Sequence, residues 1–502
     1  MKKLAYILTG LVCAGLQSCY NDDSSLGGNP IIEIAVGSDA KDSINMYFND
    51  ELRINADIQS STDDLTYEWG IGLYQTENKT VFKTVSDQKD LVYIPRELGH
   101  YEIRQMVTSK DGSTMKYYHL FVNSPYEEGF LILGRKENGK GSISFLKTLT
   151  PEEIAQGMQP IWRQHVYQEV NGEELYDDPV DCDKVGDYLY ILHGTSQKMI
   201  QINAKTMMKQ MEYDFGSYQT DFIPTRMMSY DGKFSRDFYV PSRNGGVAAV
   251  QTREQYIFPY LELPKDRYTW IDAVDRPSYF SSCEEIYIGR TPGSNVNNVL
   301  CWSGANADRE IAMRPCYDYF EDKEIINLFM NEKNDGNDVF TFNKQGGQLY
   351  ITAINSMMYN FSNGTAPWIM FERPLSNAEI IDENTQLLTN DLYSCVFISH
   401  ENKVYKWFYN QPNEDLPSTP FIELPAGEEI RCINHYVVSR SDEDYQVNSR
   451  EKQTEIYIAT CNPNREGEFK GSLYVYNADT GEQQLKYEGI SDEPVDMFYK
   501  IK

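Results

Sequence analysis

A short acidic segment offers the clearest opportunity for acid–base chemistry in this chain. It contains Glu173, Glu174, Asp177, Asp178 and Asp181. Two carboxyl groups a few ångströms apart can act as the acid and base, or the acid and nucleophile, of a glycoside hydrolase. With 75 acidic residues in the chain, however, clusters of this kind arise by chance. We therefore expect a protein that is not an enzyme, and we keep a carbohydrate-active enzyme, a glycosidase or lyase with paired carboxylates, as the alternative.

Two other segments look like ligand loops, but each lacks an essential residue. Residues 134–140 (GRKENGK) match a phosphate-binding loop until Gly141 stands where Ser or Thr would hold magnesium, and a strand is expected to follow instead of a helix. Residues 334–338 (NDGND) lack the acid at position twelve of an EF-hand loop. We predict that both are turns.

Nucleophilic, metal and cofactor chemistry have no sequence support. The six His residues are scattered, and the chain has no HExxH, GxSxG or CxxC motif. We therefore predict no metal, no cofactor and no catalytic residue, and we expect most of the Cys side chains to be small buried apolar groups.

Aromatic side chains in loops are better candidates for binding. Trp270, with Tyr268 close by, and Trp368 fall in segments that we expect to be loops. An aromatic ring there can stack on a sugar or hold a peptide side chain, and the alternative is packing between structural repeats. Trp302 and Trp407 end predicted strands, so we place them in the core. The ligand-binding prediction is thus Trp270, Trp368 and Tyr268, with a glycan or oligopeptide as ligand.

A strand–turn–strand pattern that repeats after residue 125 predicts the scaffold for these loops. We count seven repeats, and all-strand repeats of this length are typical of a β-propeller. Helical insertions are predicted at residues 150–153 and 376–379, which have the capping-box spacing, and at residues 320–330. The predicted strand pairs are 129–133 with 142–146, 188–192 with 199–202, 237–240 with 246–250, 285–288 with 298–302, 348–351 with 358–361, 394–398 with 403–407, and 455–459 with 472–476.

A duplicated tripeptide predicts how the repeat array ends. Pro179-Val180-Asp181 precedes the second repeat, and Pro494-Val495-Asp496 recurs near the end of the chain, before a strand with no later partner. We expect this last strand, residues 497–501, to pair with residues 130–133 of the first repeat. Such pairing would close a ring and remove the exposed sheet edges that promote aggregation.

The segment before the repeats has the alternating pattern of an immunoglobulin-like β-sandwich over residues 31–124. Strands are predicted at residues 52–58, 66–69, 99–107 and 116–122. Tyr67 and Trp69, then Gly99 and Tyr101, then an Asp-Gly turn and a final strand resemble a PKD (polycystic kidney disease) domain. We place Trp69 in its core.

The first residues resemble the export signal of a bacterial lipoprotein. Two Lys residues and an apolar run too short to span a membrane form a signal peptide over residues 1–18. Leu16-Gln17-Ser18-Cys19 resembles a lipobox, which implies that Cys19 is acylated and begins a flexible tether, residues 19–30. Asp22 and Asp23 resemble the signal that sends lipoproteins of the Bacteroides group to the outer face of the outer membrane.

Charge and motif order together define the expected function. The formal net charge of −29 excludes nucleic acid as a partner, because phosphate binding needs a basic surface. The order of lipobox, acidic signal, PKD-like module and propeller is similar to PKD-like family lipoproteins of Bacteroides-type bacteria. That resemblance implies a surface-exposed accessory protein that binds a nutrient or docks on a SusC/SusD-type importer, with a purely structural role in the importer complex as a further alternative.

Overall fold

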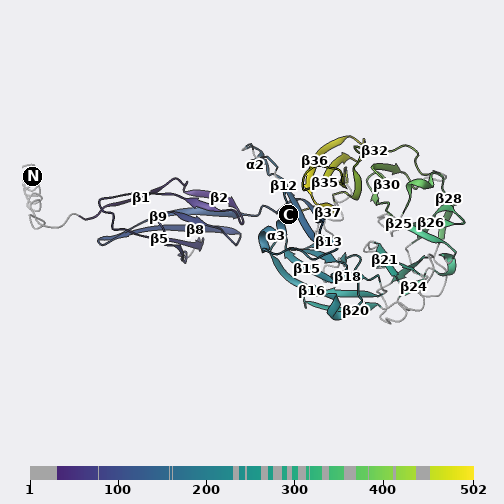
Figure 1. Cartoon of the computed structure of the whole chain (residues 1–502), viewed down its shortest axis with the longest axis horizontal. Helices are drawn as coiled ribbons and strands as arrows, with labels where there is room; N and C mark the ends of the chain where they lie inside the picture. Colours follow the sequence, from purple (N-terminus) through teal and green to yellow (C-terminus); the bar gives the residue numbers. More distant parts are fainter. Residues whose placement is uncertain are drawn as a thin grey trace, which may run out of the picture. The chain divides into compact units, whose positions relative to one another are not determined.

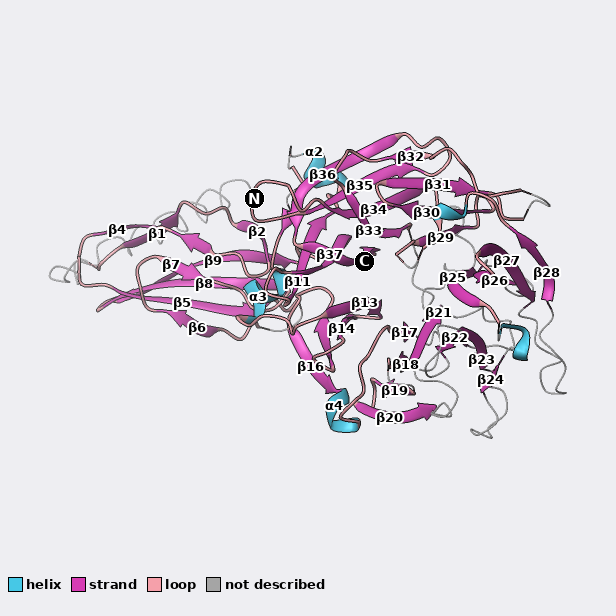
Figure 2. Ribbon diagram, turned by 45° about the vertical axis from the view of Figure 1, so that its right-hand side comes forward, coloured by secondary structure: helices cyan, strands magenta, loops and turns pink. Residues whose placement is uncertain are grey.

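The computed structural model describes most of the chain after residue 30. The described residues are 31–76, 79–155, 157, 159–160, 162–229, 237–243, 246–261, 270–274, 285–290, 297–302, 313–315, 317–320, 322–330, 338–355, 369–382, 384–410, 414–436 and 453–501. The chain divides into two compact units, residues 1–123 and 124–502. Across the described part, strands dominate and the helices are short (Figure 2), and none of these helices is long and apolar enough to span a membrane.

Where the structure describes it, the first unit forms nine strands. Its main sheet has the order β2-β9-β8-β5-β6, and the pairs β1-β4 and β3-β7 form two smaller sheets. The predicted strand at residues 52–58 is two strands in different sheets, because Asn55 leaves the pairing and binds the Asp39 side chain at 2.6 Å. The strands are β1 (Ile34–Ser38), β2 (Ser43–Tyr47), β3 (Leu52–Ile54), β4 (Ala56–Ser60), β5 (Thr66–Leu73), β6 (Lys83–Ser86), β7 (Leu91–Tyr93), β8 (Gly99–Ser109) and β9 (Gly112–Asn123).

Trp69 lies at the centre of this unit, as predicted. Its side chain is fully buried and its ring stacks on Tyr118 with the ring centroids 6.3 Å apart. The indole Nε1–H donates to the carbonyl oxygens of Gln88 and Lys89. The buried indole therefore keeps a partner for its polar atom, as the burial of a Trp side chain requires.

The described residues of the second unit form seven four-stranded antiparallel sheets that follow one another in chain order (Figure 1). The sheets are β12-β11-β10-β37 (Trp162–Arg163, Gly141–Lys147, Gly129–Arg135, Glu493–Lys500); β13–β16 (Pro179–Val185, Tyr188–His193, Lys198–Asn203, Lys209–Asp214); β17–β20 (Met228–Ser229, Asp237–Pro241, Val247–Gln251, Tyr256–Leu261); β21–β24 (Trp270–Val274, Glu285–Arg290, Asn297–Trp302, Met313–Pro315); β25–β28 (Glu324–Met330, Asp338–Gln345, Gln348–Asn355, Ile369–Pro374); β29–β32 (Leu387–Asn390, Cys395–His400, Lys403–Trp407, Ile422–Glu423); and β33–β36 (Glu429–Asn434, Glu455–Cys461, Gly471–Asn477, Gln483–Ser491).

The last strand completes the first sheet. β37 pairs antiparallel with β10, with Tyr499 opposite Phe130 and Met497 opposite Ile132. This is the pairing that the sequence predicted for the end of the chain. β37 also lies beside β13 and β33, which are the first strands of the second and seventh sheets. We call β13, β17, β21, β25, β29, β33 and β37 the inner strands.

Consecutive sheets pack face to face through apolar clusters. Tyr190 of the second sheet meets Phe238 of the third, with ring centroids 4.5 Å apart. Trp407, which is 1% exposed, packs against Phe342 of the fifth sheet, so its predicted core position is confirmed. Burial of these large side chains between sheets is the main force that holds neighbouring repeats together.

The predicted strand pairs are present in six repeats and wrong in one. They form β10/β11, β14/β15, β18/β19, β22/β23, β30/β31 and β34/β35. In the fifth repeat β27 forms its hairpin with β26, on its N-terminal side. The partner predicted at residues 358–361 lies outside the described residues.

The three helical predictions have three outcomes. Residues 151–155 form α2 (Pro151–Ala155), and Thr150 and Glu153 exchange the two hydrogen bonds of a capping box. Residues 378–380 form only a 3-10 turn, η4 (Ala378–Ile380), whose N-cap Asn377 makes no side-chain cap. Residues 320–330 are the end of η2 (Tyr317–Phe320) and strand β25, so a helix there is wrong. Adjacent β-branched Ile325 and Ile326 favour the strand, which pairs along β26.

Candidate functional site

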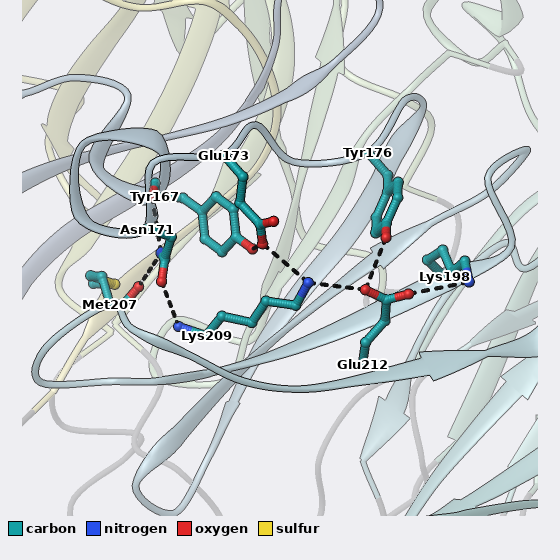
Figure 3. A network of polar contacts seen from close by, with 8 residues as sticks. All are labelled: Tyr167, Asn171, Glu173, Tyr176, Lys198, Met207, Lys209 and Glu212. Carbon is teal, nitrogen blue, oxygen red and sulfur yellow. Dashed lines mark hydrogen bonds and ion pairs between the residues drawn. The ribbon is translucent and has the colours of Figure 1, made fainter.

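The acidic segment follows a short helix, α3 (Val166–Asn171), that packs against the first two sheets. The Asn171 side chain fixes the end of this helix, because its Nδ2 donates to the carbonyl oxygens of Tyr167 and Met207. Its Oδ1 accepts from the backbone N–H of Lys209 at 2.8 Å. These bonds attach the helix to the edge strand β16 and determine where the next residues lie (Figure 3).

Glu173 belongs to a network of polar contacts on the second sheet (Figure 3). It accepts from the Tyr167 hydroxyl at 2.6 Å and from Lys209 Nζ at 3.1 Å. Lys209 also binds Glu212, which accepts from Tyr176 and pairs with Lys198. The hydrogen bond from Tyr167, followed by that from Lys209, lowers the pKa of Glu173. Glu173 is therefore ionised, and lysine side chains balance the negative charges of this network.

The next three acids have other partners. Glu174 accepts from Lys136 Nζ at 2.8 Å, and Asp177 lies 3.5 Å from Lys140 Nζ. Both lysines belong to residues 134–140, which form the predicted turn between β10 and β11. Asp178 lies 3.6 Å from Arg135 and accepts the backbone N–H of residue 195. The carboxylates of this segment thus pair with different Lys and Arg side chains of the first two sheets.

A second carboxyl group, that of Asp496, influences the pKa of Asp181. Asp181 Oδ2 accepts the backbone N–H of Met227, ahead of the third sheet, at 2.6 Å. Asp496 Oδ2 accepts the backbone N–H of Cys182 in the second sheet at 3.1 Å. Burial, reinforced by the charge of Asp496 and opposed by that of Arg226, raises the pKa of Asp181 well above its usual value. The two Asp residues come from the two Pro-Val-Asp tripeptides.

A bulge in β13 and another in β37 aim these carboxylates at the neighbouring sheet. Val180 and Val495 are extra residues in the pairing of β13 with β14 and of β37 with β10. Asn327 of β25 also follows a bulge, and its Nδ2 donates to the carbonyl oxygen of Thr385, before the sixth sheet, at 2.7 Å. A bulge redirects a side chain. The same backbone feature therefore recurs where inner strands are joined.

The geometry favours a joining role for this carboxyl pair over acid–base catalysis. Asp496 uses both oxygens for backbone N–H groups, since its Oδ1 accepts from Met497 at 2.8 Å. The nearby Cys182 thiol is buried, and this burial, followed by the charge of Asp496, raises its pKa and disfavours the thiolate. The sequence had marked both tripeptides, but the electrostatic interaction between the two Asp residues depends on sheets far apart in the chain.

A Ser–Asp–His contact near the first sheet does not have the order of a nucleophilic triad. Asp492 Oδ2 accepts from Ser142 Oγ at 2.6 Å and lies 2.9 Å from His165 Nε2. In a triad the imidazole stands between the hydroxyl and the carboxylate, whereas here the carboxylate is in the middle. In the described part of the chain, no three His, Cys, Asp or Glu side chains converge in a way that could hold a metal ion.

The predicted binding and anchoring residues fall mostly outside the described part. Trp270 is the first residue of β21 and pairs with Arg290 of β22, so its predicted position in a loop is wrong. Tyr268 and Trp368 lie outside the described residues, as do Cys19, Asp22 and Asp23 and the turn predicted before Asp338.

The fold and these contacts define an all-β protein with a sandwich unit and a unit of seven joined sheets. Residues 19–179 match the model of the PKD-like family, which supports the resemblance seen in the sequence. No curated protein is significantly similar to the chain.

Solved structures with similar folds include two Bacteroides proteins. A quinonprotein alcohol dehydrogenase-like protein from Bacteroides thetaiotaomicron is 12% identical, with 91% of this chain and 96% of that chain covered and a TM-score of 0.49. A DUF4784 family protein from Bacteroides caccae is 8% identical, with 91% and 97% covered and a TM-score of 0.30. AztD from Citrobacter koseri is 9% identical, with 86% and 97% covered and a TM-score of 0.28.

Proposed function

We propose that the protein is a lipid-anchored accessory lipoprotein on the outer face of the outer membrane, where it binds a glycan or peptide nutrient and docks on a SusC/SusD-type importer. The observation that carries this proposal is the family match, which begins at Cys19, the residue we expect to be acylated, and extends through the sandwich into the second sheet. The proposed chain therefore has an anchor, a spacer and a binding unit in that order.

The binding unit, in this proposal, is a closed seven-bladed β-propeller. The seven successive sheets, and the pairing of β37 with β10, support it. Closure by strands from both ends of a unit fixes the sheets around one axis and presents loops on a rigid frame. In this proposal the ligand contacts Trp270, at the start of β21, together with Tyr268 and Trp368.

The contacts of the acidic segment support binding over catalysis. Four of its five acids lie beside a Lys or Arg side chain, and Asp181 accepts a backbone N–H. Glycoside hydrolysis needs one carboxyl group to protonate the leaving group while the other attacks or activates water. Carboxylates that are committed to structural partners are poor candidates for either role.

The anchor is tested with Cys19→Ala in cells that carry the full gene. The variant should lose acylation and leave the membrane fraction, whereas Cys13→Ala, in the signal peptide but outside the lipobox, should stay there. A non-penetrating protease should remove the wild-type protein from intact cells. Full protection from the protease would place it in the periplasm, and membrane retention of Cys19→Ala would end the lipid-anchor proposal.

Importer docking is tested by affinity purification in mild detergent. A tagged protein should retain an outer-membrane barrel protein of the SusC type, which mass spectrometry would identify. The Cys19→Ala variant is the control, because loss of the anchor should reduce contact with a membrane partner. Recovery of the tagged protein alone, at low salt and after crosslinking, would contradict docking.

Ligand binding is tested by calorimetry with pools of glycans and peptides. Trp270→Ala or Trp368→Ala should weaken binding, whereas Tyr256→Ala, at a well exposed position of β20, should not. The ligand should be unchanged after long incubation. Turnover that Asp177→Asn or Asp181→Asn abolishes would instead establish the enzyme alternative.

A further inference from the structure

Two histidines lie side by side on the main sheet of the first unit. His100 is on β8 and His119 is on the neighbouring strand β9, where the residue opposite His100 is Phe121 and the residue opposite His119 is Glu102. The two histidines are therefore diagonal neighbours on one face of the sheet. His100 Nε2 and His119 Nδ1 are 3.1 Å apart, and both side chains are half-buried.

Aromatic neighbours hold the two rings in place. The His100 ring stacks on Phe121, with centroids 4.1 Å apart and planes 15° apart. Tyr74 packs against both imidazoles, at 4.3 Å from His100 and 5.2 Å from His119. Burial, and then the neighbouring His119, lowers the pKa of His100. A neutral imidazole is the form that binds metal ions.

The separation of the two nitrogens fits a shared metal ion. Imidazole nitrogens bind zinc at about 2.0–2.1 Å, so two on one ion lie about 2.9 Å apart at a right angle and about 3.4 Å apart at the tetrahedral angle. The observed 3.1 Å lies between these limits. Both nitrogens become acceptors when the rings carry their protons on His100 Nδ1 and His119 Nε2, a change of tautomer with no net change of charge.

We propose that His100 and His119 form a two-imidazole site for a divalent transition-metal ion of the zinc–copper class. Imidazole ligands select these metals over magnesium and calcium, which prefer oxygen. Water completes the coordination, and Glu102, opposite His119 on the sheet, adds negative charge beside the site. The net charge of −29 raises the local concentration of cations. This site lies in the spacer and is independent of the nutrient-binding proposal.

The test is calorimetric titration of the full-length protein with zinc chloride at pH 7.5 in mild detergent. Millimolar magnesium occupies oxygen-rich sites and suppresses binding to the many carboxylates. The wild type should bind one zinc ion per chain. His100→Ala or His119→Ala should lower the zinc affinity at least about 10-fold, which is the loss typical of mutations around a bound metal. His400→Ala, a half-buried histidine of β30 near Asp382, is the matched control and should bind as the wild type does.

A second measurement covers the case in which an Ala variant fails to fold. Zinc should protect His100 and His119 of the wild type from diethyl pyrocarbonate, as peptide mapping would show. Unchanged zinc affinity in folded His119→Ala, or equal modification with and without zinc, would overturn the proposal.

Discussion

Lys500 provides the sharpest quantitative prediction for the second unit. It is the last residue of β37, its side chain is 1% exposed, and its Nζ donates to the carbonyl oxygens of Tyr126 at 2.7 Å and Glu127 at 2.6 Å. These bonds attach the chain segment before β10 to the strand that completes the first sheet. Burial lowers the pKa of Lys500 from 10.5 to about 7.

The direction of the pH dependence follows from linkage. Between pH 7 and pH 10 the unfolded chain keeps a proton on Lys500 that the folded protein has largely released, so stability must rise with pH. Each pH unit in the middle of this window is worth about 1.4 kcal/mol, and the gain from pH 7 to pH 10 amounts to about 3.5 kcal/mol. Below pH 7 both states are protonated and the dependence ends.

Lys500→Met isolates this contribution, because Met keeps an apolar stem and cannot titrate. Urea denaturation at pH 7, 8, 9 and 10, followed by tryptophan fluorescence, gives the free energy of unfolding of each protein. The wild-type value minus the variant value should increase by about 3.5 kcal/mol across the series. Lys486→Met, at an exposed site of β36, controls for the loss of one positive charge. A wild-type-minus-Lys500→Met difference that is constant from pH 7 to pH 10 would refute the reasoning.

Two further stability predictions concern buried carboxylates. Glu428→Ala should lower the free energy of unfolding by about 3 kcal/mol in urea denaturation. The Glu428 side chain is 2% exposed and forms an ion pair with Arg465 at 2.5 Å, and removing one partner of a buried ion pair is costly. The exposed Glu466→Ala should change the free energy of unfolding little. The Asp181→Asn variant should be at least as stable as the wild type at pH 7. The Asn side-chain oxygen can still accept the hydrogen bond from the Met227 N–H, and the substitution removes a carboxyl group whose raised pKa shows that burial disfavours its charged form. This advantage should shrink on acidification and be lost below about pH 3.8, the ordinary Asp pKa, because Asp181 is then protonated in both states; an advantage that grows on acidification would contradict it.

Most hairpins of the second unit could be predicted because their signal is local. Short continuous apolar runs, such as those around Tyr190 and Tyr457, indicate a buried strand, and a polar turn joins it to its partner. The pairing of the last strand could also be predicted from the sequence, because a strand without a later partner must pair with one earlier in the chain. These inferences need no knowledge of how the sheets pack.

The wrong secondary-structure predictions arose where the residue pattern fitted more than one kind of element. In residues 320–330 the spacing of Ile325, Leu328 and Phe329 fits one face of a helix, but these residues are buried as part of a strand. The wrong helix hid β25, and the prediction missed that β27 pairs with β26 on one side and β28 on the other. Trp270 was placed in a loop although Tyr, Thr and Trp are residue types that favour strands. The next strand of the same sheet decided each case.

The candidate site shows why a cluster in sequence is a poor guide to chemistry. Glu173 and Asp181 are eight positions apart, yet one joins a lysine network on an outer strand and the other interacts electrostatically with Asp496 at the inner strands. An inner strand pairs on one side only, so N–H groups such as that of Cys182 need acceptors from elsewhere, and Asp496 supplies one. Asp181 and Asp496 thus accept backbone N–H groups from a neighbouring part of the fold, a structural role that a cluster of acids in the sequence does not reveal.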